Sequence, residues 1–260
     1  MRTGAENGRL WGANAQAWAD FQEAQFRPVT EAVLARCAIG PGSAYLDAGC
    51  GAGLAAQLAA ERGAHVSGLD AAEGMLAIAR RRVPQGDFRH ADLEEFPFPS
   101  HTFDVVTGFN SFQFAGDPVT ALREARRVAK PGGIVAIVSW SEPERMEFTA
   151  IARALKPLLP APADGSPGPF ALSNEERLRS VAAEAGLAAF DSVELDCVWK
   201  YRDLDFALRA LSSTGRTAQA IELLGAEAVD RAHRDALAPF RQPDGSFRLL
   251  ALFRCLLTRA

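Results

Sequence analysis

Between residues 43 and 140, short apolar runs alternate with segments of helical periodicity. The apolar runs cover residues 44–46, 65–69, 87–89, 103–109 and 133–140, and the helical patterns cover residues 54–62, 72–82 and 118–129. Strands and helices that alternate at this spacing favour a parallel sheet with helices on both faces. The strand-sized runs are apolar along their length, which is typical of strands covered on both sides. We therefore expect an α/β fold.

The flanking segments predict further elements. Residues 1–40 are expected to be helical, because their large apolar residues are spaced for one face: Trp11, Trp18, Phe21, Phe26 and Val33. Residues 157–169 are rich in proline and predict a loop. Ser173 begins a capping box with Glu176, which opens a helix that ends at Gly186. The later elements are a strand at 193–201, helices at 204–239 with breaks at Gly215 and Gly225, and a final strand at 247–257.

Composition limits the class of protein. The chain has 260 residues, 48% of them hydrophobic, which is enough for a large core and excludes a disordered chain. Its net charge of −4 disfavours a nucleic-acid partner, because phosphate neutralisation needs a basic surface. The start of the chain lacks the apolar stretch of a signal peptide, and no apolar run reaches the ~18 residues of a membrane helix. We therefore expect a soluble, cytoplasmic protein with no membrane partner.

No metal or disulfide site is expected. The four cysteines, Cys37, Cys50, Cys197 and Cys255, form no CxxC pair and have no histidine cluster beside them. The histidines at positions 65, 90, 101 and 233 are expected to be structural or solvated, so no catalytic residue is assigned.

A glycine-rich loop follows the first predicted strand. The run Asp47-Ala48-Gly49-Cys50-Gly51-Ala52-Gly53 leads directly into a helix pattern. Glycine permits positive φ and lets a ligand approach the backbone, and the following helix start offers free N–H groups. This combination predicts a nucleotide or cofactor loop at the carboxyl edge of the sheet.

The residues around the loop narrow the choice of ligand. The dinucleotide pattern GxGxxG would need glycine at position 54, which is Leu54, and the ending of a phosphate-binding P-loop is absent. Asp47 beside the loop would repel a pyrophosphate but would suit a cation such as S-adenosylmethionine. Asp70 ends the second strand, where it can accept the hydroxyls of an adenosine ribose. Asp92 follows the third strand, placed for an adenine amino group, and Asn110 follows the fourth.

The same residues carry a resemblance to a known family. The stretches LDAGCGAG (46–53), GLDAAEGMLAIAR (68–80), ADLEEFPFPSHTFDVV (91–106) and LREARRVAKPGGIVAIVSW (122–140) agree with it in order and spacing. The chain resembles class I S-adenosylmethionine-dependent methyltransferases, in particular the small-molecule group that includes the quinone-biosynthesis C-methyltransferases. The run Asn110-Ser111-Phe112-Gln113 lacks the prolines of the amino-methylating DNA enzymes.

The resemblance implies a fold, a cofactor and an activity. The fold is a doubly wound, Rossmann-like, mostly parallel seven-stranded sheet with an antiparallel last strand. The cofactor is S-adenosyl-L-methionine, whose sulfonium methyl moves to a small-molecule acceptor by in-line displacement. We expect an N-terminal helical segment or lid at 1–42, a cofactor-binding core at 43–140, and the rest of the sheet at 141–260. A substrate-side helical insertion at about 202–243 lies between the last two strands, since loops on a rigid scaffold often carry specificity.

The resemblance also implies site residues. Asp47, Gly49, Cys50 and Gly51 would line the methionine part of the cofactor, together with Asn110, Ser111 and Phe112. Asp70 would hold the ribose with Ala71 and Met75 near the adenosine, and Ala91, Asp92 and Leu93 would frame the adenine. Trp11, Trp18 and Trp140 are candidates for the substrate side.

Several alternatives stay open at this stage. An NAD(P)-dependent Rossmann oxidoreductase and a non-catalytic S-adenosylmethionine-binding protein are the other functions that the glycine loop allows. Trp11 and Trp18 either belong to a core or close over the cofactor, and a homodimer is neither indicated nor excluded.

Overall fold

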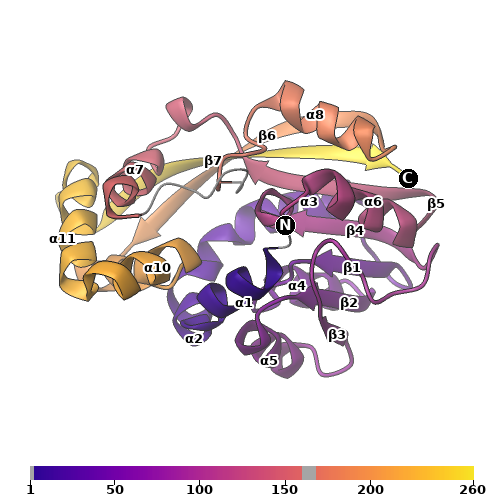
Figure 1. The fold of residues 1–260 in the computed structure, drawn as a ribbon, viewed down its shortest axis with the longest axis horizontal. Helices are drawn as coiled ribbons and strands as arrows, with labels where there is room; N and C mark the ends of the chain where they lie inside the picture. The colour runs from indigo at the N-terminus through magenta and orange to yellow at the C-terminus, as the bar shows by residue number, and fades with distance from the viewer. Residues whose placement is uncertain (1–2, 160–167) are drawn as a thin grey trace.

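The structure of the protein is a computed structural model that describes residues 3–159 and 168–260. Within these ranges a seven-stranded sheet has the order β3-β2-β1-β4-β5-β7-β6 (Figure 1). The strands are β1 Ala44–Ala48, β2 His65–Asp70, β3 Asp87–His90, β4 Phe103–Phe109, β5 Ala129–Trp140, β6 Ala188–Tyr201 and β7 Phe247–Arg259. Strand β7 is antiparallel to both β5 and β6, and the other neighbours are parallel. The predicted fold class is thereby confirmed.

The strand order reverses direction at β1. The chain moves outward from β1 to β2 and β3, then returns to the other side of β1 with β4 and β5. Such a reversal opens a crevice at the carboxyl ends of the strands, where α/β folds bind their ligands. Asp47 lies at this point, in register with Gly68 of β2 and Thr107 of β4.

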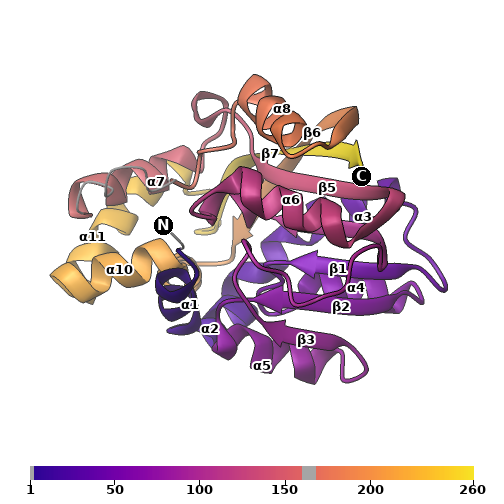
Figure 2. The same cartoon turned by 45° about the vertical axis from the view of Figure 1, so that its right-hand side comes forward.

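Helices cover both faces of the sheet. The helices are α3 Arg27–Arg36, α4 Leu54–Glu61, α5 Glu73–Arg82, α6 Pro118–Val128 and α8 Glu175–Glu184. One hydrophobic cluster joins α3, α4 and α5 to the sheet, and a second joins α6 and α8 (Figure 2). Consecutive residues of β1 serve the two clusters, since Tyr45 belongs to the first and Leu46 to the second. This alternation is the reason that the strand is apolar along its length.

The N-terminal segment is helical, as predicted, but it is not one helix. It consists of α1 Gly4–Gly12, α2 Ala15–Ala17, the π-helix η1 Trp18–Gln22, the 3-10 helix η2 Glu23–Phe26 and α3. Pro28 lies in the first turn of α3, where it is tolerated because its missing N–H would have no partner. The breaks bring Trp11 and Trp18 into edge-to-face contact, with ring centroids 5.2 Å apart.

The predicted insertion between the last two strands is confirmed as α9 Leu204–Ser212, α10 Gly215–Leu224 and α11 Ala226–Leu237. Together with α7 Thr149–Leu155, these helices form a layer beyond the strand ends, next to α1 and α2 (Figure 1). Asp203 and Thr214 cap α9 and α10 with their side-chain oxygens. None of the described helices is long and apolar enough to cross a membrane.

Several sequence-based boundaries were wrong. Asn174, not Ser173, caps α8 by accepting from Arg177 N, because Ser173 donates its hydroxyl to Phe170 O instead. Strands β5 and β6 begin four and five residues earlier than predicted (Ala129 against 133, Ala188 against 193), because antiparallel and bulged pairing continues past the apolar runs. Of the loop predicted at 157–169, residues 160–167 lie outside the described residues, and Lys156–Leu158 form the 3-10 helix η5.

Candidate functional site

The loop between β1 and α4 presents bare backbone. Gly49, Gly51 and Gly53 all have positive φ, at 74°, 53° and 92°. A Cβ at Gly49 would overlap the side chain of Ser111, whereas a Cβ at Gly51 would meet no atom within 4 Å. Gly51 lines a cavity, so the space that a side chain would fill there is left for a ligand. The amides of Gly49 and Cys50 donate to Leu69 O at 2.8 and 2.9 Å, which fixes the loop to β2.

A buried and a partly buried carboxylate, Asp47 and Asp70, lie beneath this loop. Asp47 is 2% exposed, and the hydroxyl of Thr107 donates to it at 3.4 Å. Asp70 accepts from the amides of Gly51 and Ala72, both at 2.8 Å. Burial, and then the charge of Asp70, raise the pKa of Asp47 to about 7. Burial also raises the pKa of Asp70. Within the described ranges neither carboxylate forms an ion pair, so both are placed to gain from a cationic ligand.

A third carboxylate, Asp92, contacts the N-terminal helix. It accepts from the amide of Glu94 at 2.8 Å and from the amide of Gly4 at 3.2 Å. The side chains of Thr3 and Asn7 donate to Phe114 O, so α1 is fastened across the edge of the sheet. Gly8 makes the closest approach, because a Cβ there would overlap the carbonyl group of Ala71.

The close approach of Gly8 to Ala71 allows a test of how α1 packs against the edge of the sheet. In Gly8→Ala we expect α1 to lift from Ala71, with loss of amide protection over residues 3–12 in hydrogen exchange. Gly12→Ala is the matched control, because a Cβ there lies 3.8 Å from Ala72 Cβ, an ordinary contact. Replacing glycine by alanine favours the helix by about 1 kcal/mol at Gly8, in the interior of α1, and by less at Gly12, its last residue. Helix propensity therefore favours protection in Gly8→Ala, and a loss there must come from the clash. Equal protection in the two variants would contradict this packing of α1.

The cavity above the loop, of about 920 Å³, brings most of the predicted residues together. Those that line it are Trp11, Trp18, Asp47, Gly49, Cys50, Gly51, Asp70, Ala71, Met75, Asp92, Leu93, Asn110, Ser111 and Trp140. Two predicted residues are not among its lining. Phe112 is 1% exposed and packs into the core beside Gly108, and Ala91 packs behind the strand end, where its amide donates to Asp70 O. The side chain of Phe112 is thus turned away from the cavity, whereas Ala91 is partly exposed, and the role of both residues at the cofactor stays a prediction.

Beside Trp11, Trp18 and Trp140, the cavity contains aromatic residues that were not predicted to lie there. Aromatic rings form one side, which we call the aromatic wall: Trp11, Trp18, Phe26, Trp140, Phe148 and Trp199. Neighbouring rings of the wall are in contact, with centroid separations of 5.5 Å for Trp18–Phe26, 5.3 Å for Phe26–Trp199 and 4.6 Å for Phe148–Trp199. Phe26 carried a signal as part of an apolar face, whereas Trp199 was marked as part of a predicted strand at 193–201. Phe148 carried none, because its neighbours in the cavity are distant in sequence.

Charged residues were missed as well. Glu23 is buried, pairs with Arg82, and accepts from the amide of Leu54 at 3.3 Å at the start of α4. Arg153, Lys156 and Arg216 line the cavity from the helical layer. Helical periodicity marks such residues only as a polar face, so nothing in the local sequence distinguishes them from solvated charges.

Comparison with known proteins agrees with this geometry. A family described as "Methyltransferase domain" matches residues 46–137. Malonyl-[acyl-carrier protein] O-methyltransferase of Serratia marcescens is 37% identical over 116 residues, or 45% of this chain and 46% of that protein. Demethylmenaquinone methyltransferase of Renibacterium salmoninarum is 36% identical over 127 residues, or 48% of this chain and 54% of that protein. The match thus spans about half the length of these relatives.

Solved structures extend the likeness over most of the chain. Geranyl diphosphate C-methyltransferase of Streptomyces coelicolor, in complex with S-adenosyl-L-homocysteine, has a TM-score of 0.53 at 16% identity and covers 89% of this chain and 75% of that one. The [4+2]-cyclase SpnF has a TM-score of 0.59 at 21% identity and covers 90% and 80%. At this identity the likeness establishes the fold alone. Residues 46–137 thus match a methyltransferase domain, and the relatives that share this part of the chain are methyltransferases.

Proposed function

We propose that the protein transfers a methyl group from S-adenosylmethionine to a small molecule bound in the same cavity. The observation that carries this proposal is a pair of carboxylates beneath a glycine loop, the buried Asp47 and the partly buried Asp70, neither of which forms an ion pair with a residue that the structure describes. An ion without a partner is costly to bury, and a ligand with an ammonium and a sulfonium would offset that cost. When bound, the cofactor supplies a methyl group already activated by the positive sulfur.

The proposed contacts follow the strand ends in order. Asp47 and the loop from Gly49 to Gly51 would hold the methionine part, with Asn110 and Ser111 opposite. Each oxygen of Asp70 holds one backbone amide and keeps a second lone pair for a ribose hydroxyl. Asp92 and Leu93 would frame the adenine, and Ala71 and Met75 would pack against the adenosine. Ala91 and Phe112 would support this edge from behind.

In this mechanism the chain orients and shields the reactants. An in-line displacement needs the acceptor atom, the methyl carbon and the sulfur aligned, and orientation of this kind supplies on the order of 7–11 kcal/mol. The aromatic wall would exclude water from the reacting atoms. Transfer from a sulfonium needs a general base only where the acceptor atom still holds its proton, so we assign the rate first to positioning.

The proposal extends to the surroundings of the protein. The net charge of −4 favours a small-molecule acceptor over nucleic acid. The four cysteines are free thiols in the structure, a state that the reducing cytoplasm maintains, and we place the reaction there.

Calorimetry and a labelling experiment test the proposal against its two alternatives. We expect S-adenosylmethionine to bind and NADH not to bind, because Asp47 beside the loop would repel a pyrophosphate. Binding of NADH alone would support an oxidoreductase instead. Protein that binds the cofactor is then incubated with methyl-labelled S-adenosylmethionine and a metabolite extract. Label in a small organic product supports the enzyme, and binding without any transfer supports a non-catalytic protein.

The pKa of Asp47 predicts how cofactor binding depends on pH. A cationic ligand prefers the ionised carboxylate, and this group is largely protonated below its pKa of about 7. Affinity should therefore fall as pH falls below 7, by up to about tenfold per unit, and binding at pH 6 should release a proton. The stability of the cofactor-free protein should depend on pH in the opposite direction. A raised carboxyl pKa makes the folded protein less stable as pH rises toward 7. Calorimetry in buffers of different ionisation enthalpy measures the proton release. Affinity that is flat from pH 5.5 to 8 would contradict this assignment.

A further inference from the structure

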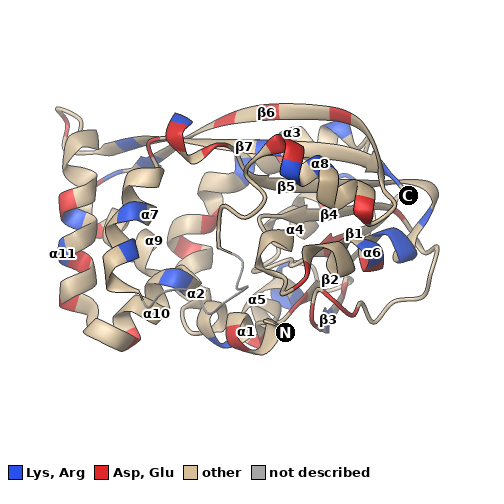
Figure 3. Cartoon of the chain, turned by 45° about the horizontal axis from the view of Figure 1, so that its top comes forward, with Lys and Arg blue, Asp and Glu red and all other residues tan. Residues whose placement is uncertain are grey.

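Three basic side chains line the cavity from the helical layer. Arg153 belongs to α7, Lys156 to η5 and Arg216 to the first turn of α10. Within residues 3–159 and 168–260, none of the three has an ion pair or a side-chain hydrogen bond. Other arginines of the same layer are paired within their own helix, Arg209 with Asp205 and Arg231 with Glu227. Figure 3 shows this mixture of signs along α11.

Arg216 is the most constrained of the three. It is half-buried, and burial lowers the pKa of its guanidinium. It also lies at a helix N-terminus, where the helix dipole disfavours a cation. An anion at this place would relieve both effects. The preceding residue packs against the aromatic wall, since a Cβ at Gly215 would lie 2.9 Å from Trp11 Cδ1.

The charges of the cavity are therefore separated by sign. Asp47, Asp70 and Asp92 are at the strand ends, with Glu23 beside the start of α4, whereas the basic residues are on the helical layer; Figure 1 shows α1 between α10 and the strands β1 and β2. The aromatic wall lies along the same cavity. Its rings come from α1, η1, η2, β5 and β6 and from Phe148, which precedes α7. The carboxylate Glu144 is an exception to this separation, since it also lines the cavity; it is exposed, as are Arg153 and Lys156, whereas Arg216 is half-buried.

We propose that the acceptor is an organic anion, with an apolar body against the aromatic wall and an oxyanion, carboxylate or phosphate, held by Arg216 with Lys156 and Arg153. Arginine suits this role because its planar guanidinium donates two parallel hydrogen bonds to such a group. This inference rests on the proposed function, which places the cofactor at the carboxylates and leaves the basic part of the cavity to the acceptor.

Four probes with one ring system test the charge preference. They are 2-naphthoate, 2-naphthyl phosphate, 2-naphthylmethanol and 2-naphthylmethylamine, each titrated into protein saturated with S-adenosylhomocysteine. We expect at least one of the two anions to bind at least tenfold tighter than the alcohol, with the amine weakest. The stronger of the two anions identifies carboxylate or phosphate as the preferred group. Equal binding of all four probes, or tighter binding of the amine, would overturn the proposal.

Variants assign the preference to its residues. Arg216→Gln should reduce the advantage of the anion over the alcohol by about tenfold, Lys156→Gln should reduce it less, and Arg216→Lys should restore part of it. Arg231→Gln, in the same layer but outside the cavity lining, should leave the advantage unchanged. If Arg216→Gln weakens binding of the anion and of the alcohol equally, Arg216 does not contribute to the preference for a negative charge.

The first titration separates the two proposals. Failure of the wild-type protein to bind S-adenosylhomocysteine would count against the proposed function. Normal cofactor binding without an anion preference would count against the nature of the acceptor alone.

Discussion

Asp47→Asn is expected to weaken S-adenosylmethionine binding by at least about 100-fold, equivalent to about 2.7 kcal/mol. The amide keeps the size of the side chain and its contact with the hydroxyl of Thr107, so the change removes charge alone. In the absence of cofactor the variant should be as stable as the wild type, or more so above pH 7. A buried carboxylate whose pKa is raised to about 7 by burial opposes folding once it ionises. Opposite effects on binding and stability distinguish a ligand-directed charge from a structural one.

Calorimetry for the cofactor and urea denaturation at pH 8 measure the two effects. Asp104→Asn is the matched control, because Asp104 lies near the start of β4, pairs with Lys130 and does not line the cavity. It should leave cofactor affinity unchanged. If Asp47→Asn bound the cofactor as the wild type does, the charge of Asp47 would have no part in recognition.

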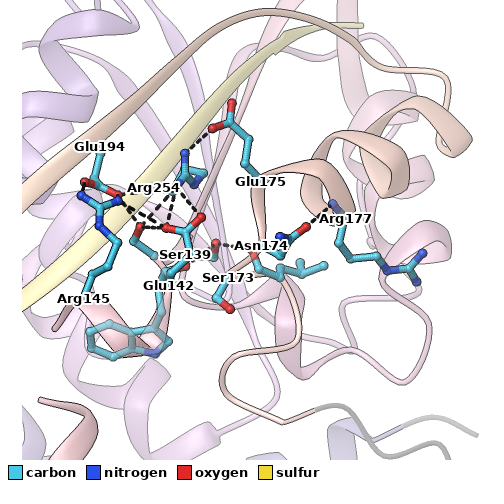
Figure 4. Close-up of polar contacts among 12 residues, drawn as sticks. Ser139, Glu142, Arg145, Ser173, Asn174, Glu175, Arg177, Glu194 and Arg254 are labelled. Carbon is cyan, nitrogen blue, oxygen red and sulfur yellow. Dashed lines mark hydrogen bonds and ion pairs between the residues drawn. The ribbon is translucent and has the colours of Figure 1, made fainter.

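Arg254→Met is expected to lower the free energy of unfolding by about 3 kcal/mol at pH 7, at the low end of the range for breaking a buried ion pair. Arg254 lies on β7 with 8% of its side chain exposed (Figure 4). Its guanidinium pairs with Glu142 at 2.8 Å, with Glu194 at 3.5 Å, and closely with Glu175 at the start of α8. Removing it leaves Glu142 and Glu194 with the exposed Arg145, and Glu175 with Arg179, as their remaining partners next to Trp140, so the aromatic wall should also loosen.

The loss of unfolding free energy in Arg254→Met should be smaller at acidic pH. Burial raises the pKa of Glu142, but the hydroxyl of Ser141 and the charge of Arg254 outweigh it and hold that pKa below its ordinary value. A lowered carboxyl pKa stabilises the protein above the ordinary pKa, and this contribution disappears as pH falls. Denaturation at pH 7 and at pH 4 measures the change.

Arg145→Met is the control for Arg254→Met. Arg145 contacts the same Glu142 and Glu194, but its side chain is 55% exposed. Its removal should therefore change the midpoint of denaturation little. A similar loss in the two variants would mean that burial of Arg254 adds nothing to the ion pairs.

Local patterns predicted most of the framework. The alternation over residues 43–140 and the glycine loop depend on neighbours in sequence, and each is visible in a short window. The carboxylates at 47, 70 and 92 could be expected at one edge because parallel strands place their carboxyl ends together. Phe112 shows the limit of that reasoning, since it follows β4 directly and yet turns into the core. Which side of a short helix faces a cavity depends on packing from elsewhere in the chain.

By itself, the sequence determined the α/β class, the place of the glycine loop and the acidic edge, since each arises from residues within one strand-turn-helix unit. Only the tertiary structure decided what surrounds that edge. It seated α1 on Asp92, assembled aromatic rings from residues 11 to 199, and set three basic residues in the same cavity without partners in the described chain. The physical reason is that burial and charge pairing are properties of contacts between distant segments, and such contacts exist only after the chain has folded.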